Sequence, residues 1–488
     1  MRRFLGLDIG TTRMKCGIYE ESGKLVYADG CDYGTKQWGR ETYLDADAIV
    51  TCAKSLLKKA YSAYPFDSIT ISSLGESFVL LDEKDEILFP PMLYTDCRGE
   101  EEAAELSAHA EKIFALSGVY PHGMYSAYKL LWIKKNRREV YDRAKKVMLV
   151  GDYVGYVLTG KRCSDYASAS RTGIFDIRKK EFSKELCALF GIEAGLFSPV
   201  APSGVKLGEI KEEILSEWGA SSSVTLVTGG HDQVCAALGA GAVEEGACAD
   251  GMGTVECLTA LYREPSADQE MGRCGYPNVP YAVNGLYCTY LLNYSCGSLT
   301  RWWLESLYTQ EEISDGSAFS ELERGFKDEP TGLLVLPYFA GASTPFQNSG
   351  AKGGILNLRL SDTPADIYKG ILEGLCMEMR LNMEETEKYG VRPQKLIVTG
   401  GGSASAKWLQ IKADVTGLPV YPLIHKEAGI CGAAMLGASA LTGESLSTLT
   451  ERFVKTGKPF TPSSERKAEY DVIYEKYKKL YKTLKEFY

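Results

Sequence analysis

The sequence has few of the residues that bind metals or cross-link small scaffolds. Its 488 residues include only 4 histidines, and none of its 14 cysteines belongs to a C-x-x-C pair. Structural zinc sites need such pairs or closely spaced histidines, and disulfide scaffolds are short chains dense in cysteine. We therefore expect neither kind of site, and we expect reduced thiols, as in a cytoplasmic protein.

Basic charge and long apolar runs are also missing. Acidic residues outnumber basic residues by 64 to 55, which gives a net charge of −9. A surface for nucleic acid or for anionic membranes would need a basic stripe. A membrane-spanning helix would need about 20 consecutive apolar residues, and Asp8 interrupts the N-terminal apolar run too early for a signal peptide. We therefore expect neither nucleic acid nor a membrane among the partners.

The common nucleotide-binding motifs are absent as well. The chain has no G-x-x-x-x-G-K-[ST], and no G-x-G-x-x-G follows its first predicted strand. An anionic cofactor can still bind through backbone N–H groups, which the net charge does not report. The length and the 45% hydrophobic content suffice for packed domains. What the chain does contain is a set of glycine-rich turns after predicted strands.

The central turn lies in the stretch VTLVTGGHDQVCAALGAG, residues 224–241. Its pattern predicts a strand over 224–227, a break at Gly229–Gly230 and then a helix. Open α/β sheets bind ligands at the carboxyl ends of their strands, which makes Asp232 a candidate for chemistry. The alternative is that Asp232 merely caps the helix, because Asp is a favoured N-cap residue.

The N-terminus predicts a β-meander with strands over 3–9, 15–19 and 24–27. The turn Gly10-Thr11-Thr12 joins the first two strands, and its N–H groups and hydroxyls could hold phosphate oxygens. The alternative is an ordinary hairpin turn that contains threonine. Elsewhere the pattern predicts strands over 68–73 and 147–150, and helices over 45–63, 99–116, 129–135, 153–158, 404–415, 429–441 and 465–487.

Two sequence echoes indicate a duplicated domain. Gly10-Thr11 recurs as Gly253-Thr254, with Gly251 in the place of Asp8, and 227–230 (VTGG) recurs as 398–401. Measured between these turns the first half is the longer one, and we place its extra residues around 74–171. We expect the boundary to divide the chain into domains 1–244 and 245–488.

The chain resembles the FGGY family of carbohydrate kinases nearly from end to end. Residues 124–136, MYSAYKLLWIKKN, satisfy the first signature of that family. Residues 353–373 resemble the second signature, with Asn357 where the family has Gly and Gly370 where it has Ala or Ser. The resemblance implies an α/β architecture, the duplicated actin-like (ribonuclease H-like) ATPase fold, with two domains and an interdomain cleft. It also implies ATP and Mg²⁺ as cofactors.

Residue by residue, the resemblance implies that Asp232 is the general base and that Asp8 holds Mg²⁺. Lys15 stands where glycerol kinases have an Arg that reaches the phosphates. The implied nucleotide contacts are Gly10, Thr11 and Thr12 in the first phosphate turn, Gly253 and Thr254 in the second, and Gly400, Gly401, Gly402 and Ser405 around the adenosine.

The implied acceptor residues mix features of glycerol and xylulose kinases. Phe78, for example, stands where xylulose kinases carry His. Each residue has a structural alternative: Glu76 could be a surface carboxylate, and Arg98 could pair with Asp96 at the surface, where such pairs contribute little. The acceptor residues that the resemblance implies are Glu76, Tyr94, Asp96, Arg98, Asp232 and Gln233.

Together these patterns favour ATP-dependent phosphorylation of a hydroxyl of a small sugar or polyol, for example a ketopentose such as xylulose. The alternatives are a non-catalytic sugar sensor and an actin-like ATPase of the same fold. A sensor would not need a base, so the presence of Asp232 together with Asp8 favours catalysis. We also expect domain closure that excludes water from ATP, and a homodimer is a further expectation.

Overall fold

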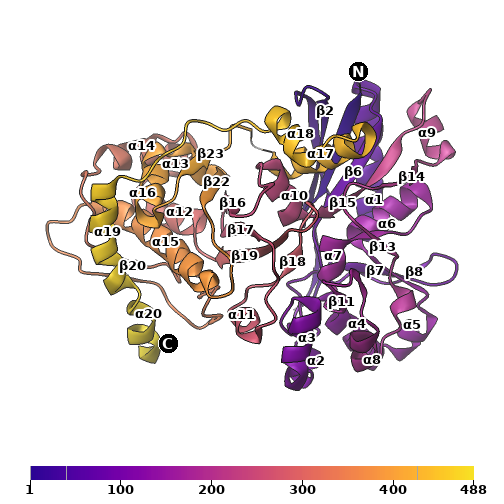
Figure 1. Ribbon diagram of the computed structural model, residues 1–488, viewed down its shortest axis with the longest axis horizontal. Coiled ribbons are helices and arrows are strands. Elements are labelled where there is room, and N and C mark those ends of the chain that lie inside the picture. The colour runs from indigo at the N-terminus through magenta and orange to yellow at the C-terminus, as the bar shows by residue number, and fades with distance from the viewer. Residues whose placement is uncertain (1, 40, 426, 488) are drawn as a thin grey trace.

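The computed structural model describes residues 2–39, 41–425 and 427–487 and shows two lobes, each built on a six-stranded mixed sheet (Figure 1). The N-terminal sheet has the order β14-β15-β6-β1-β2-β3, with β1 antiparallel to β2 and parallel to β6. The apolar side chains of its central strand β1 are buried, as expected for a strand covered on both faces. The strands are β1 Arg3–Ile9, β2 Arg13–Glu20, β3 Leu25–Asp32, β6 Ser68–Ser73, β14 Lys206–Glu209 and β15 Thr225–His231.

The C-terminal sheet repeats this arrangement. Its order is β18-β19-β17-β16-β22-β23, with β16 antiparallel to β17 and parallel to β22, and with β23 parallel to β22. In this scheme β16 corresponds to β1, β17 to β2, β22 to β6 and β23 to β15. The predicted duplication is therefore confirmed. The strands are β16 Ala247–Met252, β17 Glu256–Tyr262, β18 Val279–Pro280, β19 Tyr287–Asn293, β22 Lys395–Thr399 and β23 Val420–Pro422.

Only one of the two sequence echoes follows the duplication. The Gly-Thr turns join β1 to β2 and β16 to β17, which are equivalent hairpins. The Gly-Gly echo joins β15 to β22, which are not equivalent, because β22 corresponds to β6. The spans compared with it are therefore not equivalent, although residues 74–171, where we placed the extra residues, do lie in the insertion of the N-terminal lobe. The N-terminal lobe carries its insertion between β6 and β15, and the C-terminal lobe carries its own between β19 and β22.

The helices and small sheets of the N-terminal half fill its insertion and cover its central sheet. Among the described residues four further small sheets lie there, with orders β4-β5, β8-β7-β9, β10-β13 and β11-β12. The elements are α1 Ala46–Ala63, α2 Glu100–Glu105, α3 Ala110–Ser117, α4 Ser126–Asn136, α5 Arg138–Arg143, α6 Val150–Thr159, α7 Tyr166–Ser170, α8 Lys184–Phe190, α9 Glu212–Trp218, α10 Asp232–Gly239, β4 Lys36–Trp38, β5 Glu41–Tyr43, β7 Phe78–Leu81, β8 Ile87–Phe89, β9 Lys146–Leu149, β10 Ser164–Asp165, β11 Phe175–Asp176, β12 Glu181–Phe182 and β13 Val200–Ala201.

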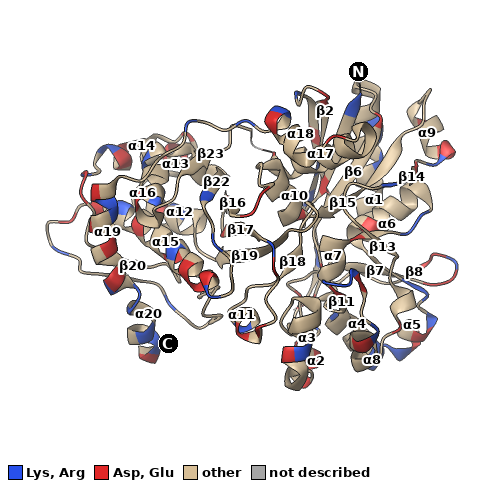
Figure 2. Cartoon of the chain, in the orientation of Figure 1, with Lys and Arg blue, Asp and Glu red and all other residues tan. Residues whose placement is uncertain are grey.

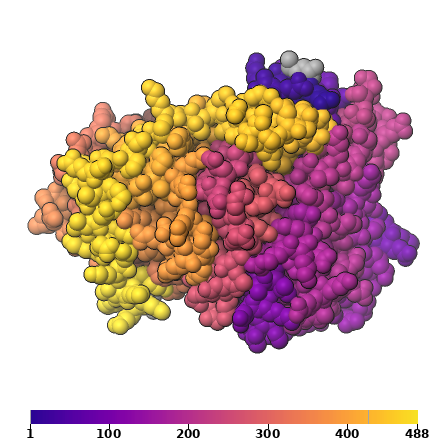
Figure 3. All heavy atoms as spheres, viewed as in Figure 1, coloured from indigo at the N-terminus to yellow at the C-terminus, as the bar shows by residue number. Residues whose placement is uncertain are grey.

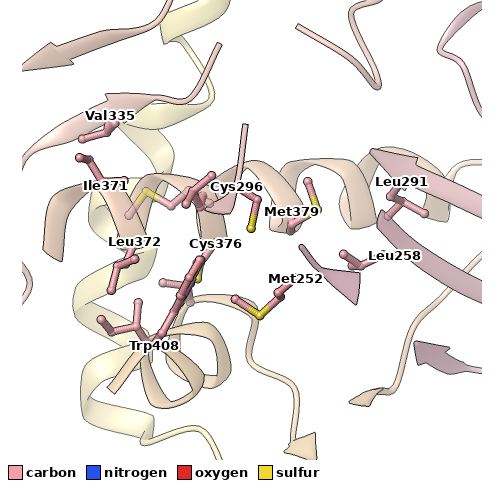
Figure 4. Close-up of a cluster of buried hydrophobic side chains, with 14 of the residues drawn as sticks. Met252, Leu258, Leu291, Cys296, Val335, Ile371, Leu372, Cys376, Met379 and Trp408 are labelled. Atoms are coloured by element: carbon pink, nitrogen blue, oxygen red, sulfur yellow. The ribbon is translucent and has the colours of Figure 1, made fainter. Parts of the chain in front are cut away.

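The C-terminal half packs its helices around a second core. Figure 4 shows Met252 and Trp408 directed toward Cys376 of the long helix α15, within a continuous apolar cluster. This core adjoins the second Gly-Thr turn, because its residue Met252 immediately precedes Gly253. The elements are α11 Gln269–Arg273, α12 Gly297–Glu305, α13 Gln310–Ser314, α14 Ser317–Arg324, α15 Pro364–Glu387, α16 Ala406–Thr416, α17 Ala428–Thr442, α18 Leu446–Phe453, α19 Ser464–Tyr477, α20 Leu480–Leu484, β20 Leu334–Leu336 and β21 Gly354–Leu356.

Helices α10 and α17 pack tightly against each other and join the lobes. A Cβ atom at Gly239 would overlap the carbonyl oxygen of Ala428, and one at Gly432 would overlap that of Cys235. The helix α17 also lies against β1 and β6 of the N-terminal sheet, so C-terminal residues cover the N-terminal lobe (Figure 3). Small residues therefore allow the two helices to approach closely.

Several predicted helices are confirmed and two are broken. Asp45 caps α1 by accepting a hydrogen bond from the Ala48 N–H at 3.1 Å, and Gly160 ends α6 in the left-handed conformation. The helix predicted over 99–116 is instead α2, a short 3₁₀ turn and α3, and the tail predicted over 465–487 divides into α19 and α20. Among the described residues, no helix combines the length and the apolar character that a bilayer crossing requires.

The prediction of reduced thiols is wrong at one pair. Cys31 of β3 and Cys52 of α1 form a disulfide, with their Cα atoms 6.1 Å apart. The signal was not in the sequence, because the two cysteines are brought together only when α1 packs across β3. Twelve further cysteines among the described residues are free.

Candidate active site

The strand β15 delivers Asp232 to the cleft. The predicted break at Gly229–Gly230 is wrong: the glycines lie inside β15, where the register against β6 shifts. Such a bulge re-aims the end of a strand. Glycine is needed because a Cβ atom at Gly229 would overlap the carbonyl oxygen of Ile71. The capping alternative is also wrong, since His231 is the N-cap residue and Asp232 is the first residue of α10.

The carboxylate of Asp232 is held by a hydrogen bond from its own helix and is repelled by neighbouring negative charges. Its Oδ1 accepts a hydrogen bond from the Gln233 N–H at 2.6 Å. Burial raises the pKa of Asp232 to about 7, with further contributions from the charges of Asp8 and Glu76, while Arg171 opposes the shift. A carboxylate with a pKa near neutral is suited to accept a proton in a reaction at physiological pH.

His231 is a structural residue that connects the lobes. Its Nδ1 lies 3.1 Å from the Tyr290 hydroxyl of β19, and its Nε2 lies 3.3 Å from Asp232 Oδ1. Burial and the nearby Arg171 hold the pKa of His231 well below its usual range, so the ring is neutral. The neutral imidazole therefore links Asp232 to the sheet of the C-terminal lobe and adds no charge to the site.

Glu76 forms a buried ion pair with a residue that the sequence did not indicate. Its Oε1 accepts from Nε of Arg171 at 2.6 Å, and both side chains are buried. The surface alternative for Glu76 is therefore wrong. Its φ of 61° and the hydrogen bond from Ser126 Oγ to its carbonyl at 2.6 Å fix the turn after β6. Arg171 follows 95 residues later, and only the fold brings the two together.

Tyr94 connects the acceptor side to the first phosphate turn. Burial together with the charges of Glu76 and Asp232 raises the pKa of the Tyr94 hydroxyl, and the nearby side chain of Thr11 opposes the shift. Asp96 and Arg98 lie two and four residues further on but do not line the same space. They form a buried bidentate pair, with Arg98 Nη2 2.6 Å from Asp96 Oδ2. The pairing that the alternative predicted is therefore confirmed, but both residues are buried and do not lie at the surface.

Lys129, which lies in the stretch that carries the first family signature, stabilises the loop of Asp96 and Arg98. Its buried Nζ donates to the carbonyl oxygens of Asp96 at 2.7 Å and Arg98 at 3.2 Å. Its hydrogen-bond partners are thus backbone carbonyls, and burial lowers the pKa of Lys129 to about 8. Phe78 belongs to the apolar core beside it. Asn357, where the second signature has Gly, has a φ of 67°, a conformation that Asn tolerates better than most residues.

A cavity of about 600 Å³ lies between the lobes on the acceptor side. The N-terminal lobe contributes Tyr94, Tyr125 and Arg171 to its wall, and the C-terminal lobe contributes Tyr290 and Arg273. Two lobes that each supply one wall can change the size of the cavity when they move. Its dimensions suit a small polar molecule.

The first phosphate turn has the geometry of a closed hairpin. Gly10 N–H donates to the Arg13 carbonyl at 3.0 Å, and the Tyr33 hydroxyl donates to the Gly10 carbonyl. Asp8, at the end of β1, accepts from Ser72 Oγ at 2.7 Å. Burial raises the pKa of Asp8, which the hydrogen bond from Ser72 partly opposes.

Lys15 reaches across to the C-terminal lobe. Its Nζ lies 3.1 and 3.2 Å from the two carboxylate oxygens of Glu427, the N-cap residue of α17. Both charges act on Asp8, so the three groups form one cluster at the mouth of the turn. Glu427 was missed by the sequence analysis, because it follows a stretch with no motif and approaches β2 only through the packing of α17.

The second phosphate turn opens on a larger cavity of about 910 Å³. Gly253 N–H donates to the Val255 carbonyl at 3.0 Å, and the Gly253 carbonyl accepts from Gly297 N–H at 2.9 Å. Ser405 caps α16 and donates to Glu323 at 2.6 Å. The predicted residues in the wall are Gly253, Thr254, Gly401, Gly402 and Ser405, and those that sequence reasoning missed include Gly297, Ser298, Trp302, Glu323 and Tyr368.

These residues fit ATP and Mg²⁺. Gly401 has open space on its Cβ side, so a nucleotide can approach the backbone there. Gly400, with a φ of 85°, is wedged against the Met252 carbonyl and shapes the turn from behind. Within the described part of the chain no cluster of three metal-ligating side chains exists. Mg²⁺ in kinases needs none, because it is held by one or two carboxylates together with water and phosphates, and Asp8 can supply the first of these.

Comparisons with known proteins agree with this arrangement. The chain is 26% identical to the xylulose kinase of Lactococcus lactis over 499 residues, covering 100% of this chain and 98% of the relative. It is 25% identical to an autoinducer-2 kinase of Salmonella choleraesuis over 508 residues, covering 98% and 93%. The crystal structure of xylulose kinase from Rhodospirillum rubrum superposes with a TM-score of 0.91 at 25% identity and covers 100% of this chain and 99% of that chain.

The family models match both lobes. The N-terminal domain of the FGGY family of carbohydrate kinases matches residues 3–239, and the C-terminal domain of the same family matches residues 251–441. The duplicated actin-like ATPase fold is thereby confirmed, and ATP and Mg²⁺ are its cofactors. The chain therefore belongs to the FGGY family of carbohydrate kinases.

Proposed function

We propose that this ATP-dependent carbohydrate kinase phosphorylates a hydroxyl of a ketopentose such as xylulose, or of a closely related small sugar or polyol, with Asp232 as the general base. One observation carries the proposal. Tyr94 lines the acceptor cavity, and both Thr11 of the first phosphate turn and the charge of Asp232 influence its hydroxyl, which supports an acceptor space that adjoins the phosphate space beside Asp232. The names of relatives such as xylulose kinase and autoinducer-2 kinase support a sugar-like acceptor.

In this mechanism the protein aligns two reactants and takes one proton. Asp232 orients the acceptor hydroxyl and accepts its proton as the oxygen attacks, while Gln233 N–H holds the carboxylate in place. Bound Mg²⁺ would neutralise phosphate charge, which together with alignment is most of what phosphoryl transfer requires. Asp8 would hold this ion, and Glu76 would bind acceptor hydroxyls. Asp96 and Arg98 would act indirectly in acceptor binding, because their buried ion pair fixes the loop that carries Tyr94.

On the nucleotide side, the two Gly-Thr turns would hold the phosphates and the large cavity the adenosine. The proposed contacts in the first turn are Gly10, Thr11 and Thr12. Lys15 would have to leave Glu427 before it could reach a phosphate. We place the domain boundary between residues 244 and 245, so that each domain contributes one phosphate turn. The adenosine site would then be formed by Gly400, Gly401, Gly402 and Ser405 of the second domain.

The acceptor assay separates this function from its alternatives. ADP release by the purified protein should be slow with MgATP alone and should rise steeply when a ketopentose is added. A coupled ADP assay across ketopentoses, polyols and deoxy sugars measures this. A basal rate that no acceptor changes would favour an actin-like ATPase, and binding of sugar without any turnover would favour a sensor. The same preparation, in light scattering, tests the predicted homodimer, and cell fractionation tests the proposed cytoplasmic location.

Substitution of Gly401 tests the adenosine site without disturbing the fold. Because a Cβ atom there meets nothing within 4 Å, Gly401→Val should leave thermal unfolding unchanged. If the nucleotide occupies that space, the side chain should raise the KM for ATP about tenfold or more, while the KM for the acceptor stays the same. Gly195→Val, at another glycine with open space but outside the cavity, is the control for ATP binding. An unchanged KM for ATP in Gly401→Val would place the nucleotide elsewhere.

A further inference from the structure

The acceptor cavity contains a buried cationic donor with an unused N–H group. Arg171 is only 5% exposed and lines the cavity wall. Its Nε and Nη2 both lie 2.6 Å from Glu76 Oε1. Its Nη1 is buried and, among the described residues, has no hydrogen-bond partner. Native proteins rarely leave such a donor unpaired, so each case calls for an explanation.

The guanidinium is fixed in place from both lobes. Its carbon lies 5.0 Å from the ring centre of Tyr125 in the N-terminal lobe and 5.7 Å from that of Tyr290 in the C-terminal lobe. Tyr290 is in turn hydrogen-bonded to His231, next to Asp232. The guanidinium is therefore held rigidly at the cavity wall and is coupled to the residues around the base. This preorganisation is typical of a recognition group rather than of a solvated surface arginine.

The charges around Arg171 indicate the class of ligand. Glu76 neutralises the guanidinium, and Asp232 and Asp8 add negative charge on the phosphate side. The surroundings of Arg171 therefore have no net positive charge that could stabilise the carboxylate of a bound sugar acid. The other arginine of the wall, Arg273, is half exposed and pairs with Glu270. A neutral oxygen is the partner that completes Nη1 without this penalty.

Resting on the proposed kinase function, we propose that Arg171 is a specificity-determining residue that donates a hydrogen bond from Nη1 to a neutral oxygen of the acceptor. The adjacent carboxylate of Glu76 accepts from a neighbouring hydroxyl. Together they form a donor–acceptor pair that selects a ketose or polyol with vicinal oxygens over a sugar acid and over the corresponding deoxy compound. A site built to hydrogen-bond an oxygen discriminates strongly against the analogue that lacks it.

The test combines protein variants with acceptors that lack single oxygens. Arg171→Lys keeps the positive charge beside Glu76 but loses the planar set of donors. For a full ketopentose its kcat/KM should fall about 10- to 100-fold, as expected for a hydrogen bond to a charged group, with the KM for ATP unchanged. For one deoxy analogue, the parent and the variant should be equal. Calorimetric binding of the acceptor without nucleotide should show the same pattern.

Two further variants keep the test decisive. Arg138→Lys changes an exposed arginine of α5 that pairs with Asp142 outside the cavity, and it should alter kcat/KM less than twofold. The double variant Glu76→Gln/Arg171→Met removes the buried pair as a unit, so it reports on recognition even if the lysine variant unfolds. Equal losses for every acceptor, or a sugar acid as the preferred acceptor, would overturn the role of Arg171. Failure of the parent protein to phosphorylate any sugar would instead overturn the proposed function.

Discussion

Replacing the base should abolish sugar phosphorylation and leave nucleotide binding nearly intact. In Asp232→Ala no carboxylate remains to accept the proton, and in Asp232→Asn the shape and the hydrogen bond from Gln233 N–H can persist while the basicity is lost. A general base typically contributes about 10²–10⁴-fold to the rate. We therefore expect at least this loss in kcat for the acceptor, with the Kd of ATP in calorimetry changed less than twofold.

The pH dependence adds a second signature of the same residue. Because burial raises the pKa of Asp232 to about 7, the parent should lose kcat/KM as the pH falls through 7 and the carboxylate is protonated. The residual activity of Asp232→Asn should not follow this limb. Asp82→Asn is the matched control: Asp82 also accepts backbone N–H groups, from Lys84 and Glu86, but in the β7–β8 hairpin outside the cleft (Figure 2). Full activity in both Asp232 variants would refute the assignment.

The Gly-Thr turns could be predicted because their signal is local. Glycine and threonine between two short apolar runs specify a hairpin, and both turns lie in equivalent hairpins of the duplicated sheets. The strand predicted over 68–73 has the observed bounds, and the predicted apolar face of α1 is buried. Each of these depends on hydrophobic periodicity within a few residues, which the sequence carries directly.

The Gly-Gly echo failed because the same letters answer different physical needs. Gly229 lacks a side chain because the Ile71 carbonyl approaches it within a bulge. Gly400 is glycine because its φ is 85° and the Met252 carbonyl lies behind it. Neither requirement can be seen without the neighbouring strand. A repeat of four residues was therefore weaker evidence for equivalent positions in the two lobes than the order of the strands.

The missing site residues are those defined by contacts between distant segments. Arg171 and Glu76 are separated by 95 residues, and Lys15 and Glu427 by 412. The pKa of Asp232 belongs to the same class. An isolated Asp has a pKa near 3.9, and the shift to about 7 comes from burial and from the carboxylates of Asp8 in β1 and Glu76 after β6. Local sequence can nominate a base, but its basicity is set by the fold.

A buried charge cluster beneath the second phosphate turn predicts the largest effect on stability. Lys412 of α16 is 1% exposed, and its Nζ contacts both Asp250 of β16 and Glu256 of β17. The two carboxylates raise the pKa of Lys412, and burial raises that of Glu256 to about 7. Asp250 and Glu256 each lie three residues from Gly253, so the cluster clamps both strands of the hairpin onto the core shown in Figure 4.

The variant Lys412→Met should lower the free energy of unfolding by about 3–5 kcal/mol, because removing one partner leaves buried charge uncompensated. That is a large share of a total stability of about 5–15 kcal/mol. Urea unfolding at pH 8 measures it. The native carboxyl groups of the variant should have pKa values far above those of the unfolded chain, so protonation favours the folded state. Part of the loss should therefore be recovered as the pH falls from 8 to 6.

Exposed Lys407 of the same helix supplies the control, since Lys407→Met should change the free energy of unfolding by less than about 0.5 kcal/mol. The triple variant Lys412→Met/Asp250→Asn/Glu256→Gln removes the charge as a unit and should recover much of the stability, because buried ion clusters contribute little net free energy compared with uncharged side chains. The KM for ATP should rise in Lys412→Met under conditions where the protein is still folded, because the strands that carry Gly253 and Thr254 lose their common anchor. A Lys412→Met variant as stable as Lys407→Met at pH 8 would show that the carboxyl groups are neutral in the native protein and that the turn is held by apolar packing alone.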